Sequence, residues 1–206
     1  MADWDGDSPR LRRNLDKVRI DLQKSALRRD VPAIELARRW HRDTLAGLDV
    51  PEPEHVGRLR GEAGARIDVH VASAEGVPHA GVKAQLGDFE QRLQTVVAAL
   101  DRRYPAGAEL DEDGVAAVTD LAGWAHAEWV RIHPFVNGNG RTARIWANCL
   151  LIRYGLPPVA RLRPRPDGGY GVAGARAMAG DWEPTARWIR RMLLELRPAT
   201  SRAKPR

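Results

Sequence analysis

The chain has 206 residues, a mass of 22.9 kDa and a net charge of +6, and 43% of its residues are hydrophobic and 29% charged. This length and composition predict one globular domain, or one domain with a small helical extension, and do not favour a two-lobed enzyme. No apolar run approaches the length needed to cross a bilayer, and the acidic start lacks the order of a secretory signal, so we expect a cytoplasmic protein without membrane segments.

Charge is distributed unevenly along the chain. Residues 1–140 carry 19 basic and 23 acidic side chains, residues 141–206 carry 14 and 4, and 29 of the 33 basic residues are arginine. Arginine suits phosphate and other anions, so the basic third is compatible with a nucleotide, a nucleic acid or an acidic protein. We do not expect nucleic-acid binding, because the aromatic residues interleaved with the arginines near the end of this part, Trp182 and Trp188, have the spacing of a helix core.

Two helices are predicted at the start of the chain. Ser8 and Pro9 are typical of a helix start, and leucines and valines follow at a helical period up to Leu27. A second helix is predicted over residues 31–45, before Gly47 and the prolines that follow. Because their apolar stripes indicate packing, we interpret residues 1–50 as an N-terminal helical extension.

A β-hairpin is predicted over residues 66–83. Ile67, Val69 and Val71 alternate with polar residues, which is typical of a half-buried strand. After a turn at residues 73–76, residues 77–83 contain a proline and a glycine and are predicted as an edge strand.

Four further helices are predicted, over residues 86–104, 111–132, 142–154 and 181–196. The third of these has apolar residues on nearly its whole circumference, including Cys149, so it is expected in the middle of a helical bundle. The single cysteine excludes an intrachain disulfide and a cysteine zinc site, and we interpret it as a small hydrophobic residue. The tail, residues 198–206, is expected to be disordered.

The candidate site for binding and catalysis lies in residues 133–144, which read His-Pro-Phe-Val-Asn-Gly-Asn-Gly-Arg-Thr-Ala-Arg. Glycines before a buried helix allow the backbone N–H groups to converge on an anion, and the helix dipole favours that anion as well. Arg141 and Arg144 are three residues apart and can reach the same polyphosphate. His133 is a candidate general base beside it, and Phe135 is interpreted as a core anchor.

This run resembles the signature of the Fic (Fido) family, His-Pro-Phe-x-Asp/Glu-Gly-Asn-Gly-Arg-x-x-Arg, and the resemblance extends over residues 60–195. It implies an all-α bundle with a small β-hairpin flap over residues 51–197, and transfer of AMP from ATP to a Ser, Thr or Tyr hydroxyl of a target protein. His133 would take the hydroxyl proton, and Arg141 would neutralise the leaving phosphates. The nucleotide phosphates would lie against Gly138, Asn139, Gly140, Arg141 and Arg144. The hairpin at 66–83 would dock the target.

Asn137 stands where the family signature has an acid that holds Mg²⁺. A neutral amide oxygen is a poorer ligand for this cation. Three outcomes stay open, in this order: Asn137 still orients Mg²⁺ held mainly by the phosphates, the donor carries another phosphate-containing group, or the domain is degenerate and binds nucleotide without turnover.

The inhibitory run that the resemblance implies, Ser/Thr-x-x-x-Glu-Gly/Asn, does not occur in the sequence. Either a separate antitoxin-like protein restrains the domain, or no restraint is needed. His126 is interpreted as a packed or solvated side chain. The other histidines, in segments without a metal-ligand spacing, are expected on the surface: His41, His55, His70 and His79. Tyr170 and Arg176 are candidates for the base pocket by their position alone.

Overall fold

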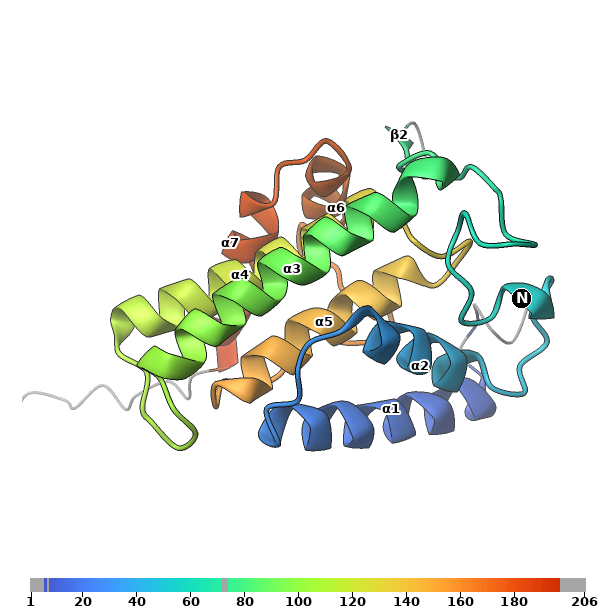
Figure 1. Ribbon diagram of the computed structural model, residues 1–206. Coiled ribbons are helices and arrows are strands. Elements are labelled where there is room, and N and C mark those ends of the chain that lie inside the picture. Colours follow the sequence, from blue (N-terminus) through green and yellow to red (C-terminus); the bar gives the residue numbers. More distant parts are fainter. Residues whose placement is uncertain (1–5, 7, 72–73, 197–206) are drawn as a thin grey trace, which may run out of the picture.

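Seven α-helices and one short hairpin make up the part of the chain that the computed structural model describes, namely residue 6, residues 8–71 and residues 74–196 (Figure 1). The elements are α1 (Pro9–Leu27), α2 (Ile34–Leu45), the 3-10 turn η1 (Pro53–His55), β1 (His70–Val71), β2 (Ala74–Glu75), α3 (His79–Arg103), α4 (Glu112–Ile132), α5 (Asn139–Arg153), α6 (Tyr170–Met178) and α7 (Glu183–Leu196). The expected all-α bundle with a small hairpin is therefore confirmed. None of these helices is long and apolar enough to span a bilayer.

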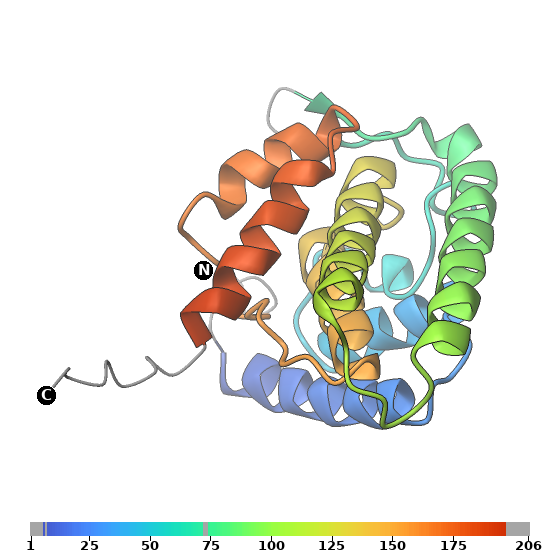
Figure 2. The same cartoon turned by 90° about the vertical axis from the view of Figure 1, so that its left-hand side faces the viewer.

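Helices α4 and α5 form the centre of the bundle. They pack against each other, α1 and α2 cover α5, α3 lies along α4, and α6 and α7 pack on the other side of α4 (Figures 1 and 2). The direct packing of α1 and α2 on α5 places the N-terminal helices in the same core as the rest. The predicted division into residues 1–50 and 51–197 stays a prediction.

Helix α5 is buried on all sides, as its sequence indicates. Every residue from Arg141 to Leu151 is buried, and Trp146 meets Trp40 of α2 edge to face with ring centroids 4.9 Å apart. The helix begins at Asn139, earlier than predicted, so the glycine loop leads directly into it. The expected tail at 198–206 lies outside the described residues.

The hairpin is shorter than predicted, and its second strand was misplaced. His70 pairs with Glu75 and Val71 with Ala74, whereas residues 79–83 already belong to α3. The helix starts there for two reasons. The Asp68 side chain accepts the backbone N–H of His79 at 2.7 Å, and the buried Val82 extends the apolar stripe of α3 backwards by one turn.

Helix α6 was missed by the sequence analysis. Its nine residues include two glycines, and its buried residues Tyr170, Ala173 and Ala177 have a helical spacing but form only a short stripe with small side chains, so its sequence signal is weak. The expectation of a surface position was also wrong for His55, which is buried and whose ring nitrogens bond to Glu52 and to the Gly64 carbonyl.

Candidate active site

His133 forms the C-terminal cap of α4 and has a left-handed backbone, with φ 54° and ψ 56°. Its Nδ1 lies 3.0 Å from the carbonyl oxygen of Val130, and because a carbonyl only accepts, Nδ1 carries the proton. In the neutral ring Nε2 is then the proton acceptor. Burial lowers the pKa of His133 below its ordinary value and the charge of Arg60 acts in the same direction, against the hydrogen bond to Val130. His133 is therefore neutral, and a potential base, at pH 7.

The loop after His133 is closed by reciprocal hydrogen bonds. Asn139 Oδ1 accepts the Phe135 N–H at 2.9 Å, and Asn139 Nδ2 donates to the Phe135 carbonyl at 2.8 Å. The Phe135 side chain is fully buried, as expected for a core anchor, and packs near Trp129. The Asn139 side chain thus holds the loop through both of its polar atoms. Only the backbone N–H of Asn139, one of the first N–H groups of α5, is left for the phosphate contact that the sequence predicts.

His41 on α2 contacts the same loop at Asn137 and Phe135. It is buried, so the expectation that it lies on the surface was wrong. Its Nδ1 accepts the Gly57 N–H at 2.9 Å, so Nε2 carries the proton and donates to the Asn137 carbonyl at 3.2 Å. The ring stacks on Phe135 at 4.0 Å, and burial lowers the pKa of His41 to about 4. Gly138 has φ +75°, and a Cβ there would lie 3.0 Å from His41 Nε2, so this position requires glycine.

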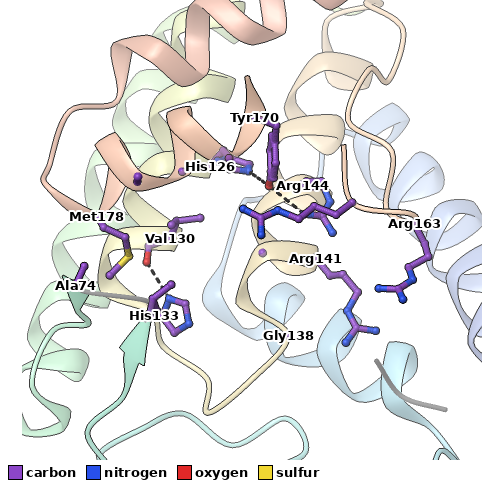
Figure 3. Close-up of a pocket in the computed structure, with 16 residues that line it drawn as sticks. Ala74, His126, Val130, His133, Gly138, Arg141, Arg144, Arg163, Tyr170 and Met178 are labelled. Atoms are coloured by element: carbon purple, nitrogen blue, oxygen red, sulfur yellow. Dashed lines mark hydrogen bonds between the residues drawn. The ribbon is translucent and has the colours of Figure 1, made fainter. Parts of the chain in front are cut away.

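A cavity of about 560 Å³ brings five of the predicted site residues together, whereas Asn137 and Asn139 are not among the residues that line it. His133, Gly138, Gly140, Arg141 and Arg144 all line it, and Figure 3 shows His133 on one side and the arginines on the other. The remaining lining comes from the hairpin, α4, the segment after α5, and α6: Val71, Ala74, His126, Val130, Arg163, Arg165, Tyr170, Gly171, Gly174, Ala175 and Met178. Of the two base-pocket candidates, Tyr170 lines this cavity and Arg176 does not.

Arg144 is held at the cavity wall by two partners. Its Nη1 donates to the Tyr170 hydroxyl at 3.0 Å and its Nη2 to the Leu162 carbonyl at 3.1 Å, while Nε is buried without a hydrogen-bond partner within the described residues (Figure 3). Because the Tyr170 oxygen accepts from Arg144, its proton points to His126 Nε2, 2.8 Å away. Burial, with the charge of Arg144, lowers the pKa of His126 to about 3 and keeps this ring neutral.

The residues present do not fit a protein-held Mg²⁺. The amide of Asn137 is neutral, its backbone carbonyl is taken by His41, and it is not among the residues that line the cavity. The described lining of the cavity contains four arginines and no carboxylate, and no cluster of three potential ligands occurs in the described part of the chain. The positive charge of the described lining comes from guanidinium groups.

A model of the Fic/DOC family matches residues 33–151, which is more than half of the chain and includes the motif and His41. This chain belongs to the Fic/DOC family.

The similar curated proteins are much longer than the segment that they share with this Fic/DOC chain. The protein adenylyltransferase Fic of Drosophila grimshawi is 33% identical over 94 residues, which are 46% of this chain and 20% of that protein. That of Drosophila melanogaster is 41% identical over 63 residues, or 31% of this chain and 13% of that protein. The chain thus aligns with a fifth or less of the length of these relatives. These similarities support the assignment of this chain to the Fic kind of enzyme.

Two solved structures share the fold. A fragment of Fic-1 from C. elegans has a TM-score of 0.63 and 27% identity, covering 87% of this chain and 47% of that fragment. A Fic domain containing signaling protein from Bacteroides thetaiotaomicron has a TM-score of 0.62 and 20% identity, covering 90% of this chain and 68% of that one. The second likeness concerns the fold alone.

Several site residues were not found by sequence reasoning. Arg163 and Arg165 lie outside the motif, and His126 was interpreted only as a packed or solvated side chain. The signal available for His126 is its spacing of two helical turns from His133, which places both on one face of α4. No local pattern marks Arg163 or Arg165 as cavity residues, because their neighbours in the cavity are distant in sequence.

Proposed function

We propose that this chain is a protein adenylyltransferase that transfers AMP from ATP to a Ser, Thr or Tyr hydroxyl of a target protein. The observation that carries the proposal is the pairing of His133 Nδ1 with the Val130 carbonyl, which leaves Nε2 as a base in the same cavity as Arg141 and Arg144. Both arginines are more than nine-tenths buried, so their charge acts with little screening by water.

The reaction is a displacement at the α-phosphorus of ATP. The target hydroxyl oxygen forms a bond to this phosphorus, its proton passes to Nε2 of His133, and the bond from phosphorus to the oxygen that bridges to the β-phosphate breaks. The electron pair of that bond leaves with pyrophosphate. Arg141 neutralises the charge that develops on the leaving group, and the guanidinium of Arg144, which lines the same cavity, attracts the terminal phosphate.

The first N–H groups of α5 complete the phosphate site. Gly138 and Gly140 line the cavity at the start of this helix, where the N–H groups have no intrahelical acceptor and the dipole favours an anion. A Cβ at Gly140 would lie 3.5 Å from Arg144 Nη1, so the absence of a side chain at Gly140 lets the phosphate chain approach the backbone. ATP is therefore bound from two sides, by peptide groups and by guanidinium groups.

The hairpin is the proposed docking site for the target. Val71 and Ala74 line the cavity, and within the described residues β1 and β2 pair only with each other. Helix α6 contacts β2, so the outer edge of β1 is the one proposed for the target. A target segment that adds to this edge as a further strand would bring its hydroxyl residue to the cavity mouth opposite the arginines.

Labelling with ATP carrying the isotope in the α-phosphate tests the proposal. The purified chain, incubated with a protein lysate, should label protein, and His133→Ala should lower the rate by at least about 100-fold, the usual contribution of a general base. Arg19→Ala, at an exposed position on α1, should label like the parent. Equal labelling by His133→Ala would contradict the mechanism. Labelling of protein by ATP that carries the isotope in the γ-phosphate, with no labelling from the α-phosphate, would identify phosphate transfer instead.

A second candidate function, binding of nucleotide without turnover, is favoured by the neutral Asn137. Calorimetry with ATP and the labelling assay together separate the two functions. A chain that binds ATP in the calorimeter but transfers neither AMP nor another nucleotide or phosphocholine group to lysate proteins is a binding module.

A further inference from the structure

Arg60 is a buried cation to which no carboxylate of the described residues is hydrogen-bonded. It lies in the segment between η1 and β1, its side chain is 0% exposed, and the nearest carboxylate oxygen, Asp68 Oδ1, is 3.9 Å away. Asp68 is itself 58% exposed and accepts from His79 instead. Burial of a guanidinium costs several kcal/mol unless its donors are satisfied, so its other partners must account for its position.

The side chain of Arg60 bonds to four backbone carbonyls from three segments, and its backbone N–H bonds to a fifth carbonyl. Nε donates to the His133 carbonyl at 2.6 Å, and Nη2 donates to the carbonyls of Ile132 at 3.0 Å and Val77 at 2.7 Å. Nη1 donates to the Ile67 carbonyl at 3.1 Å, and the backbone N–H of Arg60 donates to the Pro134 carbonyl at 2.7 Å. At the C-terminus of α4 the last carbonyls have no intrahelical donor and the dipole favours a cation, which explains why a guanidinium is stable there.

These bonds hold the backbone of His133 in its left-handed conformation. Such a conformation is uncommon for a residue with a side chain and needs support from its surroundings. Arg60 binds the carbonyls on both sides of the His133 side chain, those of Ile132 and of His133 itself, and its own N–H binds that of Pro134. The direction in which the imidazole leaves the backbone is thereby fixed.

The same guanidinium holds the base of the hairpin. The Ile67 and Val77 carbonyls flank the hairpin on its two sides, and a Cβ built on Gly76 would lie 3.1 Å from Arg60 Nη2, from His133 Cβ and from Val69. The hairpin base, Arg60 and His133 therefore lie so close together that a methyl group at Gly76 would require its neighbours to shift by a few tenths of an ångström.

We infer that Arg60 is a positioning residue that fixes the His133 ring in the cavity and ties it to the hairpin. The inference rests on the proposed function insofar as the hairpin docks the target and His133 is the base. Its physical content, that Arg60 sets the orientation and environment of the His133 ring, is independent of turnover.

The charge of Arg60 adds an electrostatic effect to the geometric one. It opposes a second positive charge on His133 and so supports the neutral ring. The other groups near these two residues that carry or can acquire charge are Asp68 and His79 beyond Arg60, and, around the cavity, His126, Arg141, Arg144, Arg163 and Arg165.

Arg60→Met and Arg60→Lys test the inference. Methionine removes both charge and donors, so kcat for AMP transfer should fall by about 100-fold, the cost of a small misplacement of a reacting group, while the Kd for ATP measured by calorimetry should change less than about 3-fold. The pH at which His133 titrates, followed by NMR of its ring nitrogens, should rise. Lysine keeps the charge but cannot span four carbonyls, so kcat should fall by about 10-fold with the His133 titration near that of the parent.

Arg153→Met is the matched control, because Arg153 is also a buried arginine, but it pairs with Asp101 at the far end of α5. It should lower the melting temperature and leave kcat and the His133 titration unchanged. The inference is overturned if Arg60→Met folds and has the kcat and the His133 titration of the parent. If Arg60→Met does not fold, the inference is overturned by an Arg60→Lys chain that has the kcat of the parent. If the parent itself transfers no AMP, the proposed function fails, and the NMR titration of His133 in the Arg60 variants still decides this inference.

Discussion

At the scale of single residues, the side chain of Asn137 decides whether the site offers a charged ligand for Mg²⁺. The family signature has a carboxylate at this position, and here a neutral amide adjoins a cavity that four arginines line. Guanidinium groups can neutralise phosphate charge directly, whereas a carboxylate would repel the phosphates unless a cation lay between them. The substitution of Asn for the acid and the arginine-rich lining are therefore consistent with each other.

This pairing predicts how the chain responds to Mg²⁺. The Kd of the parent for ATP should change less than about 3-fold between Mg²⁺ and EDTA. Asn137→Asp, which adds a charged oxygen ligand of nearly the same size, should bind ATP about ten-fold more tightly in Mg²⁺ than in EDTA, or about 1.4 kcal/mol. Calorimetry measures both. A parent whose ATP binding depends strongly on Mg²⁺, with Asn137→Asp no different from it, would contradict the prediction, and Asn137→Ala serves as the uncharged control.

At the scale of elements, helix α3 shows how a local pattern can mislead. Pro78 and Gly81 favour an edge strand when only residues 77–83 are considered, yet Gly81 lies in the first turn of a helix of 25 residues. Tertiary contacts decide the outcome, because Asp68 accepts the N–H of His79 at the start of the helix and Val82 is buried in the core.

The helical assignment of residues 79–83 predicts a difference between two identical substitutions on α3. Val82 is 0% exposed, so Val82→Ala should lower the free energy of unfolding by about 2 kcal/mol, from lost burial and the cavity that remains. Val96 is 42% exposed, and Val96→Ala should cost less than about 0.5 kcal/mol. Urea unfolding measures both values. Equal small effects would contradict the burial of Val82 and favour the edge strand.

At the scale of the whole molecule, neutral buried histidines link stability to pH. The pKa is about 4 for His41 and about 3 for His126, both lowered chiefly by burial from an ordinary value of 6.5. As the pH falls below 6.5, the unfolded chain takes up protons that the folded chain does not bind, so the stabilisation present above pH 6.5 is lost progressively toward pH 4. Burial opposes ionisation of Asp101, but hydrogen bonds from Arg153 and Tyr154 lower its pKa below 3.8, so its stabilisation is lost only at more acidic pH.

The free energy of unfolding should therefore fall by several kcal/mol between pH 7 and pH 4.5, since each pKa unit corresponds to about 1.4 kcal/mol. Urea unfolding at a series of pH values measures the slope. His41→Gln removes one buried imidazole and should give a shallower slope, whatever its stability at pH 7. His70→Gln is the control, because the His70 side chain is 68% exposed and its loss should leave the slope unchanged. A parent whose stability is constant from pH 7 to pH 5 would contradict the prediction.

Much of this protein is determined by its sequence alone. The helices α1, α4, α5 and α7 follow from apolar stripes and helix caps, since these depend on neighbours three or four residues away. The central chemistry follows from residues 133–144, because a glycine loop and two arginines at the start of one helix form a phosphate site from contiguous residues.

Only the tertiary structure decided what surrounds and supports that motif. His41 and Arg60 act through backbone carbonyls, and a carbonyl acceptor has no signature in the sequence because every residue carries one. Helix α6 and the tyrosine at its start take their position from packing on α4 and α7 rather than from their own weak propensity. The sequence determines which groups can react, whereas the packing of distant segments determines how those groups are oriented, because hydrogen bonds and burial depend on distance in space rather than along the chain.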